Sequence, residues 1–316
     1  MKNIKFFKDL NINSVDEAGG KGASLGELYS SKIPVPNGFV ILSSVFDKFL
    51  IENNLNKEIN NNLKKVNTKK TSTIEKASEI IQSLILSKEI SKELSKEILF
   101  SFKKLKTKFV AVRSSATSED SSNDAWAGQL DTYLNTTEKN LINNIKKCWA
   151  SLFTVRAIFY RFEKKLNNKH ISVAVVIQKM VDSEKSGIAF SVHPVTEDYN
   201  QLIIEAGLGL GEAIVSGAIT PDTYVVSKKP LEILDKYKGT QSKALYRSLR
   251  KGIKWKELTK KQINLQVLSD KQIVSLSKLI IKIEKHYNFP VDIEWAMENN
   301  KIFITQSRPI TTLKNF

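Results

Sequence analysis

Residues 289–311 read FPVDIEWAMENNKIFITQSRPIT, and this stretch decides how the C-terminal part of the chain folds. Its alternation of apolar and polar residues predicts a β-hairpin with a turn at 298–300. The two predicted strands are 291–297 and 302–307. Because successive side chains of a strand point to opposite faces, Asp292 and Glu294 share one face.

The return strand carries two further polar residues on a common face, Gln306 and Arg308. Carboxylate and amide oxygens are hard ligands that suit Mg²⁺, which commonly binds through one or two carboxylates and the phosphates of a substrate. Arg308 would neutralise charge on a transferring phosphoryl group. The alternative is a solvated hairpin face with an ordinary Arg–Glu pair.

A glycine cluster lies near the N-terminus, where residues 19–28 read GGKGASLGEL. The pattern predicts a turn followed by a helix beginning near Ala23, so that free backbone N–H groups and Lys21 point at one spot. The spacing G-x-x-x-x-G-K-[ST] is absent, which excludes a Walker-type loop. An ordinary turn with a surface lysine is the alternative.

The stretch FVAVRSSATSED at 109–120 predicts a buried strand with Arg113 emerging at its end, beside two serines. An arginine placed in this way suits a bidentate grip on phosphate oxygens. A structural ion pair with Glu119 or Asp120 would explain the same residue.

The run ISVAVVIQKMV at 171–181 is typical of a buried strand, with Gln178 and Met180 near its exit. A polar amide followed by a soft apolar side chain suits the edge and face of adenine. Core packing, with Met180 filling a gap, is the alternative.

The length of 316 residues allows two or three compact units, and the net charge of +16 raises the question of an anionic partner. Most of the charge lies in 44–108, which predicts lysine-rich amphipathic helices, and in 228–261, which mixes lysines with aromatic residues. Of the 49 basic residues 43 are lysine, and no groove-reading motif accompanies them, so the sequence argues against nucleic-acid binding.

The single cysteine, Cys148, cannot form an internal disulfide, which favours a reducing compartment. No apolar stretch reads as a signal peptide or a membrane span. We therefore expect a cytoplasmic protein without a membrane partner.

Taken in order, the motifs resemble the ATP-binding domain of the phosphoenolpyruvate synthase and pyruvate phosphate dikinase family, which includes the rifampicin phosphotransferases. The matching stretches are GGKGASLGEL, VPNGFVI, VAVRSSATSEDS, AGQLDTYLN, CWASLFTVRAIFYR, GLGLGEAIVSGAITPDTYVV, VDIEWA and ITQSRPIT. This resemblance implies an α+β ATP-grasp fold with two lobes and ATP between them. We expect an N-terminal lobe over 1–177, with the helical segment 44–108, and a C-terminal lobe over 178–316.

The resemblance also implies roles for individual residues. Lys21 and Arg113 match the family's phosphate-binding pair and, with Arg308, would be catalytic. Glu294 and Gln306 match the Mg²⁺ ligands. The remaining residues expected to bind ATP are Gly128, Thr132, Gln178, Met180, Val181 and Asp292.

Full-length family members continue into a swivelling domain with a phosphorylatable histidine and then a substrate domain, and we expect both to be absent here. The histidines of this chain, His170, His193 and His286, do not lie in the family's phosphohistidine motif. His193 in FSVHPVT is expected to serve loop structure.

The implied activity is transfer of a phosphoryl group, in the family a pyrophosphoryl group, from Mg-ATP to a histidine on a separate or missing domain. In the family the phosphate ends on pyruvate or rifampicin. The alternatives are a nucleotide-binding regulator without phosphotransfer and binding of an acidic polymer through 228–261.

Overall fold

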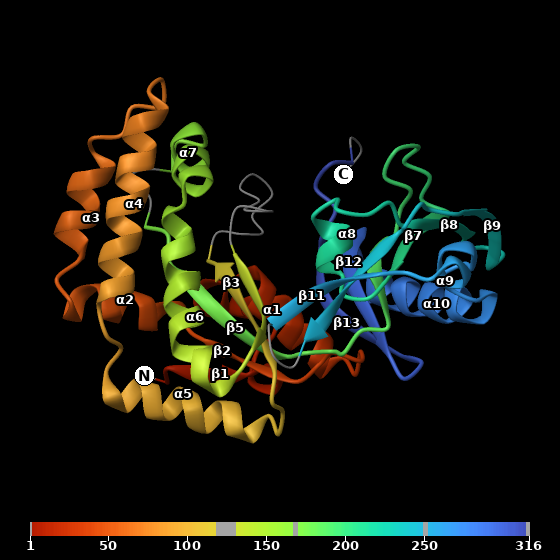
Figure 1. Cartoon of the computed structure of the whole chain (residues 1–316), viewed down its shortest axis with the longest axis horizontal. Coiled ribbons are helices and arrows are strands. Elements are labelled where there is room, and N and C mark those ends of the chain that lie inside the picture. The colour runs from red at the N-terminus through yellow and green to blue at the C-terminus, as the bar shows by residue number, and fades with distance from the viewer. Residues whose placement is uncertain (1, 118–130, 167–169, 249–251, 314–316) are drawn as a thin grey trace. The chain divides into compact units, whose positions relative to one another are not determined.

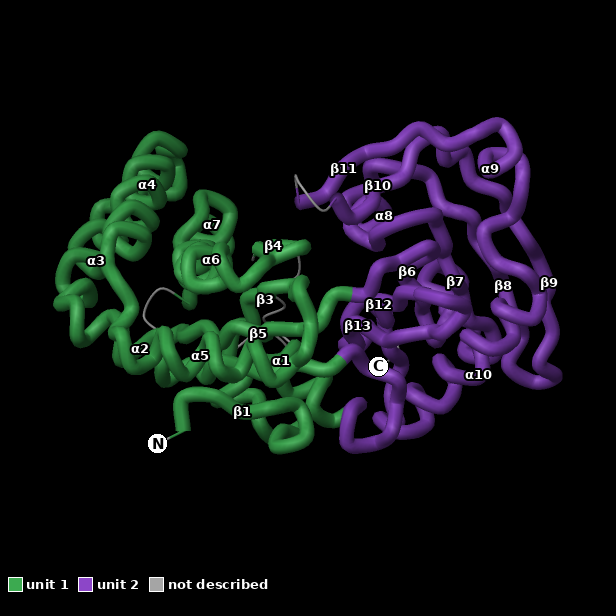
Figure 2. Tube along the Cα trace, turned by 60° about the horizontal axis from the view of Figure 1, so that its bottom comes forward, with its two compact units in different colours: residues 1–27, 37–180 green, residues 28–36, 181–316 purple. Residues whose placement is uncertain are grey.

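The computed structural model describes residues 2–117, 131–166, 170–248 and 252–313. The fold is α+β, as the sequence predicts, and the chain divides into two compact units (Figures 1 and 2). Unit 1 comprises residues 1–27 and 37–180, and unit 2 comprises residues 28–36 and 181–316. The boundary thus follows Met180, three residues beyond the expected lobe boundary, and a short N-terminal segment belongs to unit 2.

Unit 1 is built on a five-stranded antiparallel sheet in the order β1-β2-β5-β3-β4. The strands are β1 Ile4–Phe6, β2 Gly38–Ile41, β3 Val110–Ala116, β4 Thr132–Thr136 and β5 Val173–Lys179. Its helices are α1 Val15–Ser30, α2 Ser43–Glu52, α3 Asn56–Leu63, α4 Thr71–Ser87, α5 Lys92–Lys104, α6 Glu138–Ala150 and α7 Val155–Glu163. Helices α2 to α5 occupy the lysine-rich segment.

The two faces of this sheet differ in polarity. Alternate residues of β3, among them Val110 and Val112, join a buried core with helices α2, α4 and α6. The residues between them, including Arg113 and Ser115, point to the opposite face, where Gly22 of α1 lies against Val40. Helices α2, α4 and α6 therefore close one face of the sheet, and Arg113 and Ser115 lie on the other.

Unit 2 is built on a six-stranded antiparallel sheet in the order β13-β12-β6-β7-β8-β9 and a separate hairpin β10–β11. The strands are β6 Lys185–Phe190, β7 Gln201–Leu208, β8 Asp222–Ser227, β9 Glu232–Tyr237, β10 Lys243–Ser248, β11 Gly252–Glu257, β12 Val291–Glu298 and β13 Lys301–Pro309. The helices are α8 Glu212–Val215, α9 Lys260–Asn264 and α10 Asp270–Tyr287. Helix α10 contacts β9 and β12 through a buried apolar stripe. No helix in the described part of the chain is long and apolar enough to cross a membrane.

Two local predictions differ from the structure in detail. Helix α1 spans Val15–Ser30 and is interrupted by a kink at Gly19 (φ 68°, ψ 170°), so the predicted glycine turn is present but the helix after it resumes before Ala23. Arg113 lies inside β3 and not at its end, since β3 keeps its pairing with β5 as far as Ala116. The predicted hairpin 289–311 is confirmed as β12 and β13, with Asn299 and Asn300 both at positive φ in the turn.

Candidate functional site

The polar face of the unit 1 sheet gathers three of the predicted residues. Arg113 is only 6% exposed, and its Nη1 donates a hydrogen bond of 3.1 Å to Oε1 of Gln178 on the neighbouring strand β5. Thr132 on β4 lies directly opposite Arg113 in the strand register. Residues far apart in the sequence thus meet on one face because β3 is flanked by β4 and β5.

The kink in α1 places the residues on either side of Lys21 against this face. A Cβ atom on Gly19 would lie 2.2 Å from Oγ of Ser115, so only glycine fits there. The backbone N–H of Gly22 donates to the same hydroxyl at 3.3 Å. Lys21 lies between these two contacts and is half-buried, while Ser115 is two residues from Arg113. The backbone segments that carry Lys21 and Arg113 therefore lie against each other, an arrangement that suits an anion site.

Gln178 carries a further observation. Its side chain is 2% exposed, and its Nε2 has no hydrogen-bond partner among the described residues. A buried amide donor left unpaired costs free energy, so such groups normally have partners. This orphaned donor beside Arg113 fits a site that is completed by a ligand with acceptor oxygens or nitrogens.

The other predicted adenine-side residues lie at the boundary between the units. Met180 ends unit 1, and its backbone N–H donates to Phe109 O at 3.1 Å. Val181 begins unit 2, and both side chains are buried. Gly128 lies outside the described residues.

In unit 2, the hairpin β12–β13 places the remaining predicted residues on one face. Glu294 is directly opposite Gln306, and Asp292 is directly opposite Arg308. Nε and Nη2 of Arg308 contact Oδ2 of Asp292 at 2.8 and 2.7 Å. The neighbouring pair of Glu294 and Gln306 supplies the carboxylate and amide oxygens expected of a magnesium site.

The electrostatics of this face are dominated by desolvation. Burial raises the pKa of Asp292 and the nearby charge of Glu294 adds to this shift, whereas Arg308 lowers it. Burial also raises the pKa of Glu205 on β7, with a smaller contribution from Asp292. Divalent cations relieve such carboxylate crowding. Among the described residues, no three His, Cys, Asp or Glu side chains form a metal cluster by themselves.

Glu205 was missed by the sequence reasoning. The strand register runs from Gln306 through Glu294 and Ile188 to Glu205, so the two glutamates share a face. The sequence did contain a signal for Glu205, since this single carboxylate interrupts the apolar strand QLIIEAG. Its neighbours in the sheet, however, come from strands that are distant in sequence.

Comparisons with known proteins agree with this chemistry. Residues 15–315 match the family model described as "Pyruvate phosphate dikinase, AMP/ATP-binding domain". The chain belongs to this family. It is 42% identical to a probable phosphoenolpyruvate synthase of Methanocaldococcus jannaschii, covering 99% of this chain and 27% of that protein. It is 37% identical to a rifampicin phosphotransferase of Bacillus cereus, covering 97% of this chain and 36% of that protein.

The chain therefore spans well under half the length of these dikinase-family relatives. A probable phosphoenolpyruvate synthase of Archaeoglobus fulgidus, 44% identical, is matched over 98% of this chain and 42% of that protein. Among solved structures, a D-alanine-D-alanine ligase of Helicobacter pylori gives a TM-score of 0.31 at 10% identity, covering 75% of this chain and 53% of the ligase.

Proposed function

We propose that this chain binds Mg-ATP and passes a phosphoryl or pyrophosphoryl group to a histidine on another domain or chain. Membership of an AMP/ATP-binding family supports the choice of nucleotide. The observation that carries the proposal is the polar face of unit 1, where Arg113 contacts a buried glutamine whose second amide atom has no partner among the described residues.

Each unit would supply a different part of the chemistry. In unit 1, Lys21 and Arg113 offset the negative charge of the triphosphate, and Nε2 of Gln178 donates to the nucleotide. In unit 2, Glu294 and Gln306 hold Mg²⁺, and Arg308, oriented by Asp292, faces the transferring group. The metal, when bound, neutralises phosphate charge. Variants in each unit test that unit's part of the proposal separately.

A histidine acceptor elsewhere agrees with the local contacts of the three histidines present. Nδ1 of His193 accepts hydrogen bonds from the backbone N–H groups of Val195 and Thr196 at 3.3 and 3.2 Å, which supports a role in loop structure. His170 contacts Asp47 at 3.3 Å, and His286 lies 3.1 Å from the hydroxyl of Ser31. We propose a swivelling phosphohistidine domain as the partner, with a cytoplasmic location.

Calorimetric titration of ATP with and without Mg²⁺, followed by an assay for AMP and phosphate, tests the proposal. Lys21→Ala and Arg113→Ala should each weaken ATP binding by about tenfold or more, because each removes a charge-assisted contact. Lys103→Ala is the matched control, since this exposed lysine lies on α5. Unchanged ATP affinity in both site variants would refute the phosphate assignment.

The metal assignment has its own variant pair. Glu294→Ala should remove the dependence of ATP binding on Mg²⁺, whereas Glu298→Ala, at the end of the same strand, should retain it. A magnesium titration that is the same in both variants contradicts the role of Glu294. Tight binding without phosphotransfer to an added histidine domain would favour a nucleotide-binding regulator.

A further inference from the structure

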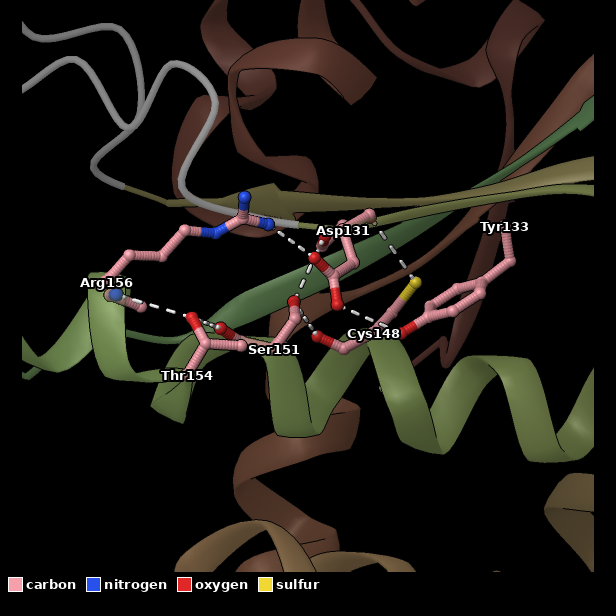
Figure 3. Close-up of polar contacts among 8 residues, drawn as sticks. Asp131, Tyr133, Cys148, Ser151, Thr154 and Arg156 are labelled. Carbon is pink, nitrogen blue, oxygen red and sulfur yellow. Dashed lines mark hydrogen bonds and ion pairs between the residues drawn. The ribbon is translucent and has the colours of Figure 1, made fainter. Parts of the chain in front are cut away.

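Asp131, at the start of β4, joins three elements of unit 1 (Figure 3). Its carboxylate accepts hydrogen bonds from Nη2 of Arg156 at 2.6 Å and from the hydroxyl of Tyr133 at 3.0 Å. Its main-chain oxygen accepts from the backbone N–H and the hydroxyl of Ser114 at 3.2 and 2.7 Å. One residue thus connects β3, β4 and the first turn of α7.

These contacts lie on the opposite face of the sheet from the proposed nucleotide. Ser114 and Asp131 face helices α6 and α7, where the Ser114 hydroxyl contacts Oγ of Ser151 at 3.3 Å. Their chain neighbours Arg113 and Thr132 form a directly opposed pair whose side chains point to the other face. Asp131 therefore cannot contact a ligand held by Arg113, but it fixes the backbone on which Arg113 and Thr132 are carried.

The groups around Asp131 make its contacts sensitive to charge. The Cys148 thiol is fully buried beneath it, 3.9 Å from the main-chain oxygen of Asp131. Burial raises the pKa of that thiol, and the charge of Asp131 raises it further. Arg156 supplies a positive charge on the accessible side of the carboxylate. Without the positive charge of Arg156, the negative charge of Asp131 would be less compensated at the phosphate site.

We propose that Asp131, paired with Arg156, is a positioning residue for phosphate binding. It holds the start of β4 against β3, keeps Thr132 opposite Arg113, and has its charge balanced by Arg156. This inference rests on the proposed function, in which Arg113 binds the phosphates of ATP. It assigns the two residues an effect on the terminal phosphates of ATP and none on the AMP portion of the nucleotide.

The test is a double-mutant cycle of Asp131→Asn and Arg156→Gln, with dissociation constants measured for Mg-ATP and for AMP. Each single variant should weaken Mg-ATP binding about three- to tenfold and change AMP binding less than about twofold. The double variant should bind Mg-ATP no more weakly than the weaker single variant, because the pair is already broken. Arg156→Lys, which keeps the charge, should recover part of the loss.

Two controls separate positioning from folding. The side chains of Asp131 and Arg156 are 31% and 53% exposed, so breaking the ion pair should change the urea midpoint little. Lys103→Gln breaks an ion pair with Glu138 that is also exposed and lies in the same unit, and it should leave both dissociation constants unchanged.

Three results would overturn the inference. Wild-type affinity for Mg-ATP in both single variants, while Arg113→Ala binds weakly, would remove the positioning role and leave the proposed function intact. Equal losses for ATP and AMP, accompanied by a lower urea midpoint, would show a purely structural contact. Wild-type affinity in Arg113→Ala would overturn the inference and the proposed function together.

Discussion

Replacement of Gly19 by alanine should be one of the most damaging single-methyl changes in unit 1. Gly19 has φ 68° and ψ 170°, a backbone conformation that is essentially restricted to glycine. The added Cβ would lie 2.2 Å from Oγ and 2.4 Å from the main-chain oxygen of Ser115. The backbone oxygen belongs to a strand paired on both sides, so it cannot move aside without disturbing the sheet.

The magnitude follows from two costs. Holding an alanine in this backbone conformation costs about 1–3 kcal/mol. Forcing an additional methyl group into a packed site costs a further 1–3 kcal/mol, approximately. Gly19→Ala should therefore destabilise unit 1 by about 2–6 kcal/mol. The affinity for ATP should fall in the same variant, because Lys21 is carried by the displaced turn.

Gly217→Ala is the matched control. Gly217 has nearly the same φ, 69°, but no atom lies within 4 Å of the position its Cβ would occupy. Only the backbone cost of about 1–2 kcal/mol applies there. Hydrogen exchange of β3 and of the 207–217 loop, followed in urea, measures the free energy of unfolding of each unit separately. If Gly19→Ala costs no more than Gly217→Ala, the close packing of the glycine turn on Ser115 is refuted.

Four other outcomes are expected. Burial raises the pKa of the Cys148 thiol above its ordinary value of 9.0, so this thiol ionises first in the unfolded chain. The free energy of unfolding should therefore fall as the pH rises above 9.0, by up to about 1.4 kcal/mol per pH unit. Cys148→Ala should lack this slope in urea titrations at about pH 8–10. Asp222→Asn should destabilise unit 2 by about 2–4 kcal/mol in urea without changing the dissociation constant of ATP. Gln178→Leu should raise that constant about tenfold by calorimetry, since it removes the donor and the Arg113 contact. Lys228 and Glu284 form a partly buried ion pair at 2.7 Å, so replacing either by Met should lower the urea-unfolding free energy by about 2 kcal/mol, whereas replacing both should cost less.

The hairpin 289–311 could be predicted because its information is local. Alternation decides which residues of β12 share a face, and Asn299 and Asn300 accept the positive φ that a tight turn needs. The facing pairs do not follow from the turn alone, because the register shifts between Glu294 and Trp295: an unbroken register would place Glu294 opposite Thr305, whereas the structure places it opposite Gln306.

The strand order of the two sheets could not be predicted in this way. In unit 1, β3 lies between β4 and β5. No local pattern in the sequence indicates that β5, about 60 residues further along the chain, pairs along the whole of β3. The extra pairing is why Arg113 lies inside a strand and why Gln178 meets Arg113 as its neighbour. Glu205 was not predicted for the same reason, because β6 lies between the strands of Glu205 and Glu294.

Two buried polar side chains, Asp222 and Gln178, differ in how their hydrogen bonds are satisfied. Asp222 is 3% exposed, and both of its oxygens are used: Oδ1 accepts from Gly239 N at 2.8 Å, and Oδ2 accepts from Val267 N and the Tyr224 hydroxyl at 2.8 and 3.1 Å. A group satisfied in this way needs no ligand, and it fixes two loops to β8. Gln178 is buried as deeply, yet one of its amide atoms has no partner among the described residues. In the proposed site the nucleotide supplies the acceptor for that atom, so we expect loss of Gln178 to affect binding where loss of Asp222 affects stability.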